Sequence, residues 1–324
     1  RGFFGASGSS TLEHFVNGVA RDITDPETNL SVRQRLYLRE IADAKSGQER
    51  MKLRGGEDLP IRALGSGSDY TVFIDHLGIA SLNMGYGGED PGGIYHSIYD
   101  DFYWYTHFGD TNFTYGRALS QTVGTAVMRL ADADLLPFEF TDLATTIQEY
   151  LTQLEKLADD SRSEAIERDK ELDEGVFKAV SNPTEPTYAP PREPVPPHLN
   201  FAPFENAADA LTNAAKRYHD ALQKAWAAGV PADKLQGLNH KMMQSERDLT
   251  TQEGLPRRAW YKHMIDAPGV YSGYGAKTIP GVREAIEQKH WDEANSQIER
   301  IATVLNRETS LINSAADELA GSAK

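Results

Sequence analysis

A glycine-rich stretch between residues 64 and 101 constrains the fold of this 324-residue chain more than any other segment. It begins with the bend Gly65-Ser66-Gly67, whose glycines permit positive φ angles and let the backbone approach a ligand closely. It ends with a second glycine-rich segment, residues 85–93, which is followed by Tyr95 and His96. Loop residues held by a rigid scaffold are a common location of binding and catalytic groups.

The residues between and after these two loops predict a helix, a strand and a second helix. Ser68 can cap a helix whose apolar residues recur at i, i+3, i+4 and i+7 from Tyr70, and Gly78 can end it. Residues 79–82 are apolar and predict a buried strand, whereas the glycines of 85–93 predict a loop. The aromatic segment that follows, residues 101–108, is expected to form a half-buried helix.

The remainder of the first 136 residues predicts few further strands. The expected elements are helices at 12–23, 32–44 and 115–133, a polar surface loop at 45–59 and a short strand at 60–64. In helix 115–133, the residues expected to face inward are Ala118, Val123, Val127 and Leu130. Two or three strands are fewer than a doubly wound α/β domain contains, so residues 1–136 are expected to be only part of one.

The chain becomes helical after Pro137. Apolar spacing predicts helices at 140–158, 163–180, 204–228, 232–250, 281–289 and 291–319. Two proline-rich segments interrupt them, and the first, between residues 182 and 203, is expected to be an extended arm. The sequence therefore predicts a partial α/β domain with an incomplete sheet over residues 1–136, followed by an all-α domain over residues 137–324.

Composition excludes several kinds of site and partner. Cysteine is absent, so neither disulfides nor thiolate metal sites are possible. The net charge of −15 argues against nucleic acid or an anionic membrane surface as a partner. No stretch of about 18 uninterrupted apolar residues is present, so we expect no membrane segment in this chain. Because the first residue is Arg1, with neither an initiator methionine nor a signal peptide, we expect a fragment of a longer protein.

Three motifs in this order resemble a known family. They are Leu-Gly-Ser-Gly-x-Asp-aromatic at 64–70, Leu-Gly-Ile-Ala-Ser at 77–81 and Tyr-His-Ser-x-Tyr-Asp at 95–100. They resemble the peptidase domain of glutamate carboxypeptidase II, a dizinc peptidase that shares its architecture with the transferrin receptor. The run Gly-Leu-Pro…Tyr-x-His…Ala-Pro…Tyr…Pro-Gly at 254–281 is also similar. The resemblance implies a transferrin-receptor-like helical dimerisation domain over residues 137–324, and hence a homodimer.

The resemblance assigns a metal to one histidine. His96 corresponds to the family's last zinc ligand, and neutral imidazole suits Zn²⁺. From its surroundings alone, His96 would be interpreted as a hydrogen-bonded loop histidine whose ring Asp100 or Asp101 could orient. None of the nine histidines stands in an H-E-x-x-H or Cys/His metal spacing. His76, beside Asp75 near a helix end, is expected to be a cap or a surface residue.

The resemblance also implies four residues that contact a peptide substrate. Tyr95 corresponds to the tyrosine that donates a hydrogen bond to the scissile carbonyl as it becomes an oxyanion; the alternative for this residue is core packing. Gly67, Ser68 and Tyr274 correspond to substrate-contacting positions. Ser68 replaces an asparagine, which shortens or removes a polar contact.

The positive charges of the family's specificity pocket are absent. Asn83 and Gly85 replace a pair of arginines, and Gly273 replaces a lysine next to the tyrosine. A desolvated glutamate side chain needs a cationic partner. We therefore expect an exopeptidase that acts on peptides without selectivity for glutamate; the sequence leaves open from which end it removes residues.

The resemblance implies further zinc ligands and a general-base glutamate that precede the region beginning at Arg1. The longer parent is expected to hold two zinc ions and to be exported, whereas this chain alone is expected to be inactive, with zinc absent or incomplete. Two alternatives stay open: a non-catalytic receptor or scaffold of the transferrin receptor architecture, and a helical interaction module. The sequence leaves open whether the apolar stripes of helix 291–319 serve the chain's own core or a two-fold partner: Ile298, Ile301, Val304, Leu305, Leu311 and Ile312.

Overall fold

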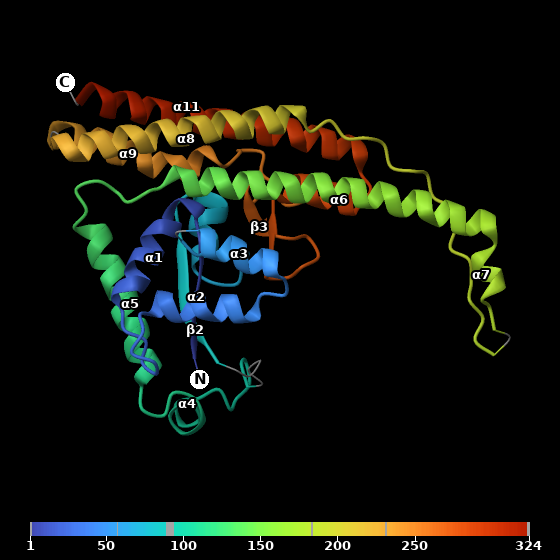
Figure 1. The fold of residues 1–324 in the computed structure, drawn as a ribbon, viewed down its shortest axis with the longest axis horizontal. Helices are drawn as coiled ribbons and strands as arrows, with labels where there is room; N and C mark the ends of the chain where they lie inside the picture. Colours follow the sequence, from blue (N-terminus) through green and yellow to red (C-terminus); the bar gives the residue numbers. More distant parts are fainter. Residues whose placement is uncertain (1, 57, 89–93, 183, 231, 323–324) are drawn as a thin grey trace.

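The computed structural model describes residues 2–56, 58–88, 94–182, 184–230 and 232–322. The described part is mainly helical and contains two small, two-stranded antiparallel sheets. Figure 1 shows a long layer of helices that includes α6, α8, α9 and α11, with a smaller mixed unit beneath it that contains the N-terminus.

The elements of the mixed unit come first in the chain. They are β1 (Phe3–Gly8), η1 (Ser10–Leu12), α1 (Glu13–Asp22), α2 (Val32–Asp43), α3 (Gly47–Gly55), η2 (Val72–Leu77), β2 (Leu82–Gly87), α4 (Phe102–Phe108) and α5 (Thr114–Ala131). The later elements are α6 (Phe140–Glu174), α7 (Val176–Ala179), α8 (Ala202–Ala228), α9 (Ala232–Asp248), β3 (Asp266–Pro268), β4 (Ala276–Thr278), α10 (Pro280–Glu287) and α11 (Trp291–Ser322).

The first sheet consists of β1 and β2, which pair from Phe3 with Gly87 to Gly8 with Leu82. On the other side of β1, Arg62 forms one parallel bridge with Ser7. Pro60 has no N–H group with which to continue this pairing. The strand predicted at 60–64 is therefore a single bridge.

The second strand lies later in the chain than the sequence predicted. Gly78 adopts φ +61°, which ends the π-helical turn η2, and the Ile79 N–H donates a hydrogen bond to Phe73 O over 2.9 Å. Residues 79–81 connect this turn to the strand, so β2 begins at Leu82 and includes the first glycines of the predicted loop. Residues 89–93 of that loop lie outside the described residues.

Helices α1 and α2 occur where the sequence predicted them, but α3 was missed. Ser46 accepts a hydrogen bond from the Glu49 N–H over 3.1 Å, and the Glu49 carboxylate accepts one from the Lys45 N–H over 2.8 Å. Ser46 and Glu49 have the spacing of a capping box, which begins a helix. The prediction of a surface loop over 45–59 gave more weight to polar composition than to this signal, and it was wrong.

The inward face of α5 agrees with the prediction only in part. Ala118 is buried as predicted and Leu130 packs against the core, but the other buried residues are Thr122 and Ala126, and Val127 is 59% exposed. Small side chains let α5 approach β2 and α1 closely. The Thr122 hydroxyl donates to Ala118 O over 2.8 Å, so its burial leaves no donor unpaired. The larger Val123 and Val127 therefore remain on the solvent side.

Helix α4 is exposed and not half-buried. Phe102 is 72% exposed and Phe108 is 64% exposed. In Figure 1, α4 lies at the end of the mixed unit farthest from the long helices. Its rings mainly contact one another, as in the pair Trp104 and Phe108, whose centroids are 4.7 Å apart.

The two helices predicted at 140–158 and 163–180 are largely one helix, α6. Residues 158–163 contain neither glycine nor proline, so no residue there breaks the helix. The first half of α6 buries Phe140, Leu143, Ile147 and Leu154. The second half continues beyond the other long helices, where the proline-rich arm lies alongside it (Figure 1).

One cluster of buried apolar side chains continues from α1 through α6 and α8 to α11. Phe140 and Tyr218 belong to it and meet edge to face, with ring centroids 5.0 Å apart. Most of the apolar stripe of α11 belongs to this core, because each of the following residues is at most 1% exposed: Ile298, Ile301, Val304, Leu305 and Ile312. None of the described helices has the length and apolar composition needed to cross a membrane.

Candidate functional site

Tyr95 and His96 lie in the turn between β2 and α4. Tyr95 is 72% exposed, and its ring stacks on the His96 ring with centroids 3.8 Å apart and an interplanar angle of 25°. His96 has φ +66°, a left-handed conformation that costs a non-glycine residue about 1 kcal/mol. An exposed imidazole on a strained turn is accessible to a ligand, and such strain is common at functional positions.

The two neighbouring aspartates do not hold the His96 ring. Asp101 caps α4 by accepting a hydrogen bond from the Trp104 N–H over 2.8 Å, and the Asp100 N–H donates to Ser97 O over 3.2 Å. Within the described part of the chain, neither carboxylate is hydrogen-bonded to the imidazole. The contact that the ring makes there is its stacking on Tyr95.

The bend Gly65-Ser66-Gly67 contacts the loop between β3 and β4, which carries Tyr274. The Ser66 N–H donates to Tyr274 O over 3.0 Å. A Cβ atom at Gly65 would lie 2.0 Å from this carbonyl oxygen, and one at Gly67 would lie 2.8 Å from Cδ1 of the Tyr274 ring. Gly67 also has φ +97°. Glycine is therefore required at both positions for the loop to approach this closely.

The Tyr274 ring covers Gly67 but stays 70% exposed, and Ser68 beside it is exposed as well. Three of the predicted substrate-contacting residues thus form one open surface that two distant parts of the chain supply. Tyr95 and His96 form a second group. Among the residues that the structure describes, no hydrogen bond or ring contact joins the two groups.

The residues present do not fit a metal pair. A catalytic zinc ion takes about three protein ligands, and the described ranges contain no group of three or more histidine, aspartate or glutamate side chains able to hold a metal. His96 offers one imidazole. Its assignment as a metal ligand stays a prediction.

Behind the bend, η2 packs against the segment that precedes β3. Asp75 O accepts hydrogen bonds from the Lys262 N–H over 2.6 Å and the His263 N–H over 3.2 Å. His76, expected to be a cap or surface residue, is partly exposed, and its ring stacks on Trp260 with centroids 4.8 Å apart. These contacts fix the bend relative to the Tyr274 loop.

The same region buries ionisable side chains that the sequence analysis did not single out. Asp75 is fully buried, and burial raises its pKa to about 7. His263 and Asp266 lie beside it and are also buried. The available signal was a charged residue directly after an apolar one in a buried segment, as in Ile74-Asp75 and Ile265-Asp266.

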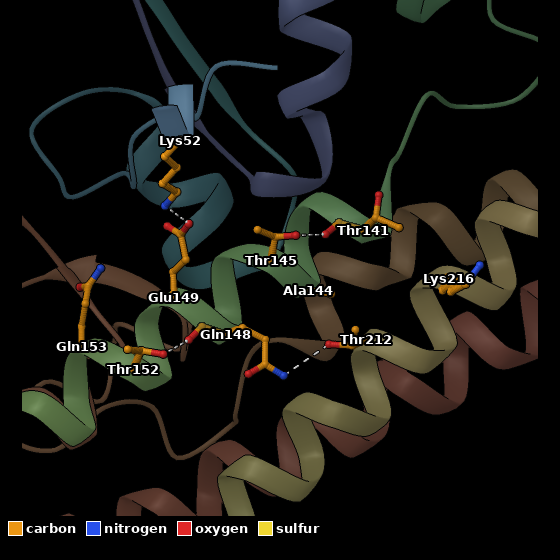
Figure 2. A pocket seen from close by; sticks show the side chains of 10 residues that line it. All are labelled: Lys52, Thr141, Ala144, Thr145, Gln148, Glu149, Thr152, Gln153, Thr212 and Lys216. Carbon is orange, nitrogen blue, oxygen red and sulfur yellow. Dashed lines mark hydrogen bonds and ion pairs between the residues drawn. The ribbon is translucent and has the colours of Figure 1, made fainter. Parts of the chain in front are cut away.

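A separate groove of about 640 Å³ lies between α3, α6 and α8. Figure 2 shows Lys52 reaching from α3 to Glu149 on α6, and Gln148 pointing toward Thr212 on α8. The lining consists mainly of threonine, glutamine and lysine side chains, and it includes none of the five predicted site residues. This groove is therefore not part of the predicted substrate surface.

Comparison with known proteins adds family evidence. Residues 199–313 match the family described as the transferrin receptor-like dimerisation domain. A probable glutamate carboxypeptidase of Arabidopsis thaliana is 30% identical over 317 residues, which are 95% of this chain and 38% of that protein. A probable glutamate carboxypeptidase of Arthroderma benhamiae is 31% identical over 267 residues, covering 81% of this chain and 32% of the relative.

A more distant relative is named as an aminopeptidase and not as a carboxypeptidase. An aminopeptidase of Mus musculus is 25% identical over 270 residues, which cover 78% of this chain and 31% of that protein. The chain thus spans about a third of the length of the curated relatives that it matches. Over the part that it spans, the chain belongs to the family of glutamate carboxypeptidase II-like peptidases and transferrin receptor-like proteins.

Proposed function

We propose that this chain supplies the C-terminal part of the substrate site of a longer dizinc exopeptidase. The observation that supports this most is the contact of the Tyr274 loop with the bend at Gly67. It places residues from both halves of the chain on one open surface, as a substrate site shared between a peptidase domain and a helical domain requires. The relatives named as carboxypeptidases and an aminopeptidase agree with an exopeptidase.

Tyr95 and His96 have separate roles in this proposal. Because the Tyr95 phenol is exposed, it can donate a hydrogen bond to a substrate carbonyl on which negative charge develops. His96 would supply one neutral imidazole to a zinc ion, whose chemistry is the activation of water. The remaining ligands and the base belong to other residues of the longer protein, so we propose that this chain alone is inactive.

We further propose that the enzyme does not select glutamate. Gly273 carries no side chain, and the space beyond its Cα is open. The lysine that follows, Lys277, is engaged by Glu287 over 2.7 Å. No cation is therefore aimed at the Tyr274 surface by the hairpin residues that the structure describes, and a buried substrate carboxylate would lack a partner.

Peptide hydrolysis by the longer protein tests this proposal. We expect it to bind zinc and to cleave peptides with uncharged terminal residues at least as fast as peptides ending in glutamate. Tyr95→Phe should lower kcat by roughly 100-fold, the typical loss for one oxyanion donor, while zinc content and thermal stability stay unchanged. A zinc-free parent with no hydrolysis would instead support the receptor or scaffold alternative.

We also propose a homodimer formed through the helical region. The buried stripe of α11 is occupied by the chain's own core, so the interface must use other residues. Trp226 on α8 and Met243 on α9 are 50% and 52% exposed, and large exposed apolar residues are common at interfaces. Light scattering at micromolar concentration should give twice the 35.8 kDa chain mass. A mass equal to one chain would contradict the proposal.

A further inference from the structure

A group of buried ionisable side chains lies where the mixed unit meets the Tyr274 hairpin. Asp75 comes from η2, and it is 0% exposed with no hydrogen-bond partner at either carboxylate oxygen. His263 and Asp266 come from the start of the hairpin and are 1% and 3% exposed. Oδ1 of Asp266 is also buried without a partner. We call Asp75, His263 and Asp266 the junction triad.

Both ring nitrogens of the histidine have partners. Nε2 lies 3.0 Å from Glu246 Oε1, and Nδ1 lies 3.1 Å from Asp266 N and 3.2 Å from Asp266 O. Within the described part of the chain, the ring therefore bonds the Glu246 carboxylate and the Asp266 backbone, and neither aspartate side chain of the triad is hydrogen-bonded to it.

Charged or titratable side chains from several elements surround the triad. They are Tyr70 before η2, Tyr150 on α6, Glu246 on α9, Arg258 in the loop before β3, and Glu284 on α10. The cation of this set, Arg258, donates to Glu284 over 2.7 Å. Its Nε and Nη2 are buried without a hydrogen-bond partner, and its charge lowers the pKa of Asp75 only as the smallest of the causes. One guanidinium thus faces Glu284 and the two carboxyls of the triad, so the carboxyls outnumber it.

Two ionised carboxylates without partners are costly in a junction that excludes water. Burial raises the pKa of both Asp75 and Asp266 to about 7. The charge of Asp266 adds to the rise at Asp75, and the charge of Glu246 adds to the rise at Asp266. For His263, burial lowers the pKa, but the hydrogen bond and charge of Glu246 outweigh it and raise the pKa. The two aspartates therefore favour their neutral, protonated forms, whereas the surrounding carboxylates favour the protonated ring at His263.

We propose that the junction triad is a pH-sensitive latch that holds the Tyr274 hairpin against the Gly65–Gly67 bend. It is closed while Asp75 or Asp266 carries a proton, and it loosens when both carboxyls are ionised. The connection to the bend is direct, because Asp75 O accepts the hydrogen bonds of Lys262 and His263 at one end of this interface, and the Ser66 N–H bonds Tyr274 O at the other. This latch does not depend on the proposed peptidase activity.

Thermal unfolding of the chain between pH 4 and pH 8 tests the latch. A carboxyl whose folded-state pKa is raised binds its proton more tightly in the folded chain, so its stabilisation is lost as pH rises from the ordinary aspartate pKa of 3.8 to about 7. Asp75→Asn cannot ionise. We expect its melting temperature to exceed that of the wild type by several degrees at pH 8 and to converge with it near pH 4.

Asp69→Asn is the matched control, because Asp69 is exposed and lies six residues before Asp75. It should follow the wild-type pH curve. Asp75→Leu also removes the ionisable carboxyl, so it can replace the asparagine variant in the test if that variant does not fold. The latch is wrong if both Asp75 variants run parallel to the wild type or fall below it at every pH.

Hydrogen exchange separates a local latch from a general loss of stability. After correction for the intrinsic pH dependence of exchange, amides of residues 262–275 should lose protection between pH 6 and pH 8 in the wild type. Amides buried in α8 and α11 should not, and Asp75→Asn should abolish the local loss. An equal loss of protection in all three regions would overturn the proposal.

Discussion

At the residue scale, the geometry around the bend depends on glycine, which has no side chain, at position 65. A methyl group at Gly65 would meet backbone atoms, namely Tyr274 O at 2.0 Å and Ala276 N at 2.7 Å. Backbone cannot rotate away as a flexible side chain can, so the hairpin would have to move. The close fit of the predicted substrate surface therefore rests on glycine at this position.

Gly65→Ala should lower the free energy of unfolding by about 1–3 kcal/mol, the usual cost of overpacking. Denaturant titration measures this change. Gly18→Ala in α1 is the control, because open space surrounds that position and alanine favours a helix interior by about 0.5–1 kcal/mol. Equal stability of Gly65→Ala and the wild type would show that the hairpin does not contact the bend.

A second prediction concerns Glu13, which lies where α1 meets α6. Burial raises its pKa to about 7, with smaller contributions from Asp142 and Asp58, while the Ile61 N–H that donates to it over 2.9 Å acts in the opposite direction. Because the folded-state pKa is raised, this carboxyl stabilises the fold at low pH, and the contribution disappears as pH rises from about 4.5 to 7.

Glu13→Gln keeps an acceptor for the Ile61 N–H and removes the ionisation. We expect its urea midpoint to exceed that of the wild type at pH 8 and to equal it at pH 4, whereas Glu174→Gln, at the solvent-exposed end of α6, should change neither value. A midpoint below the wild type at pH 8 would contradict the assigned environment of Glu13.

At the scale of elements, apolar spacing predicted most helices because each needs one buried stripe. The errors have local physical reasons. For α5, the buried face is the one whose small side chains allow close packing against β2, and the bulkier valines lie on the other side. For α6, the sequence contained no breaker, and the gap placed between two predicted helices followed polar residues that are simply solvated.

The outer half of α6 has few buried apolar residues, so its stability should depend on the proline-rich arm. Arg162 donates to Pro196 O, and Arg168 forms an ion pair with Glu193 at 3.5 Å. Arg162→Ala should speed amide exchange over residues 160–174 and leave residues 143–154 unchanged. Lys156→Ala, which removes an exposed pair with Asp160, is the control. Unchanged exchange in Arg162→Ala would mean that the arm does not stabilise this half.

At the scale of the whole molecule, one core joins the two predicted parts of the chain. The boundary at residues 136 and 137 therefore separates segments that share a buried cluster, and it stays a prediction. Glu139 N–H donates to Thr11 O over 2.9 Å across this boundary. We expect a single cooperative unfolding transition, because neither part buries its apolar surface without the other.

Ile301 on α11 is 0% exposed and lies in the shared core. Ile301→Ala should lower the free energy of unfolding by about 2–5 kcal/mol, because burial is lost and a cavity is left. Denaturant unfolding at one fixed protein concentration measures this change, since the stability of a dimer depends on concentration. Ala227→Ser, on the exposed side of α8, should change stability by less than about 0.5 kcal/mol. A small loss for Ile301→Ala would place α11 outside the core.

Periodicity, turn residues and motif spacing are local properties, so they were enough to locate most helices, the glycine bend and the three motifs in their order. Three other features required the folded chain: Tyr274 lies on Gly67, small residues form the inner face of α5, and Asp75, His263 and Asp266 are buried together at one junction. Those outcomes depend on which distant segments exclude water from one another, and no short-range pattern encodes that.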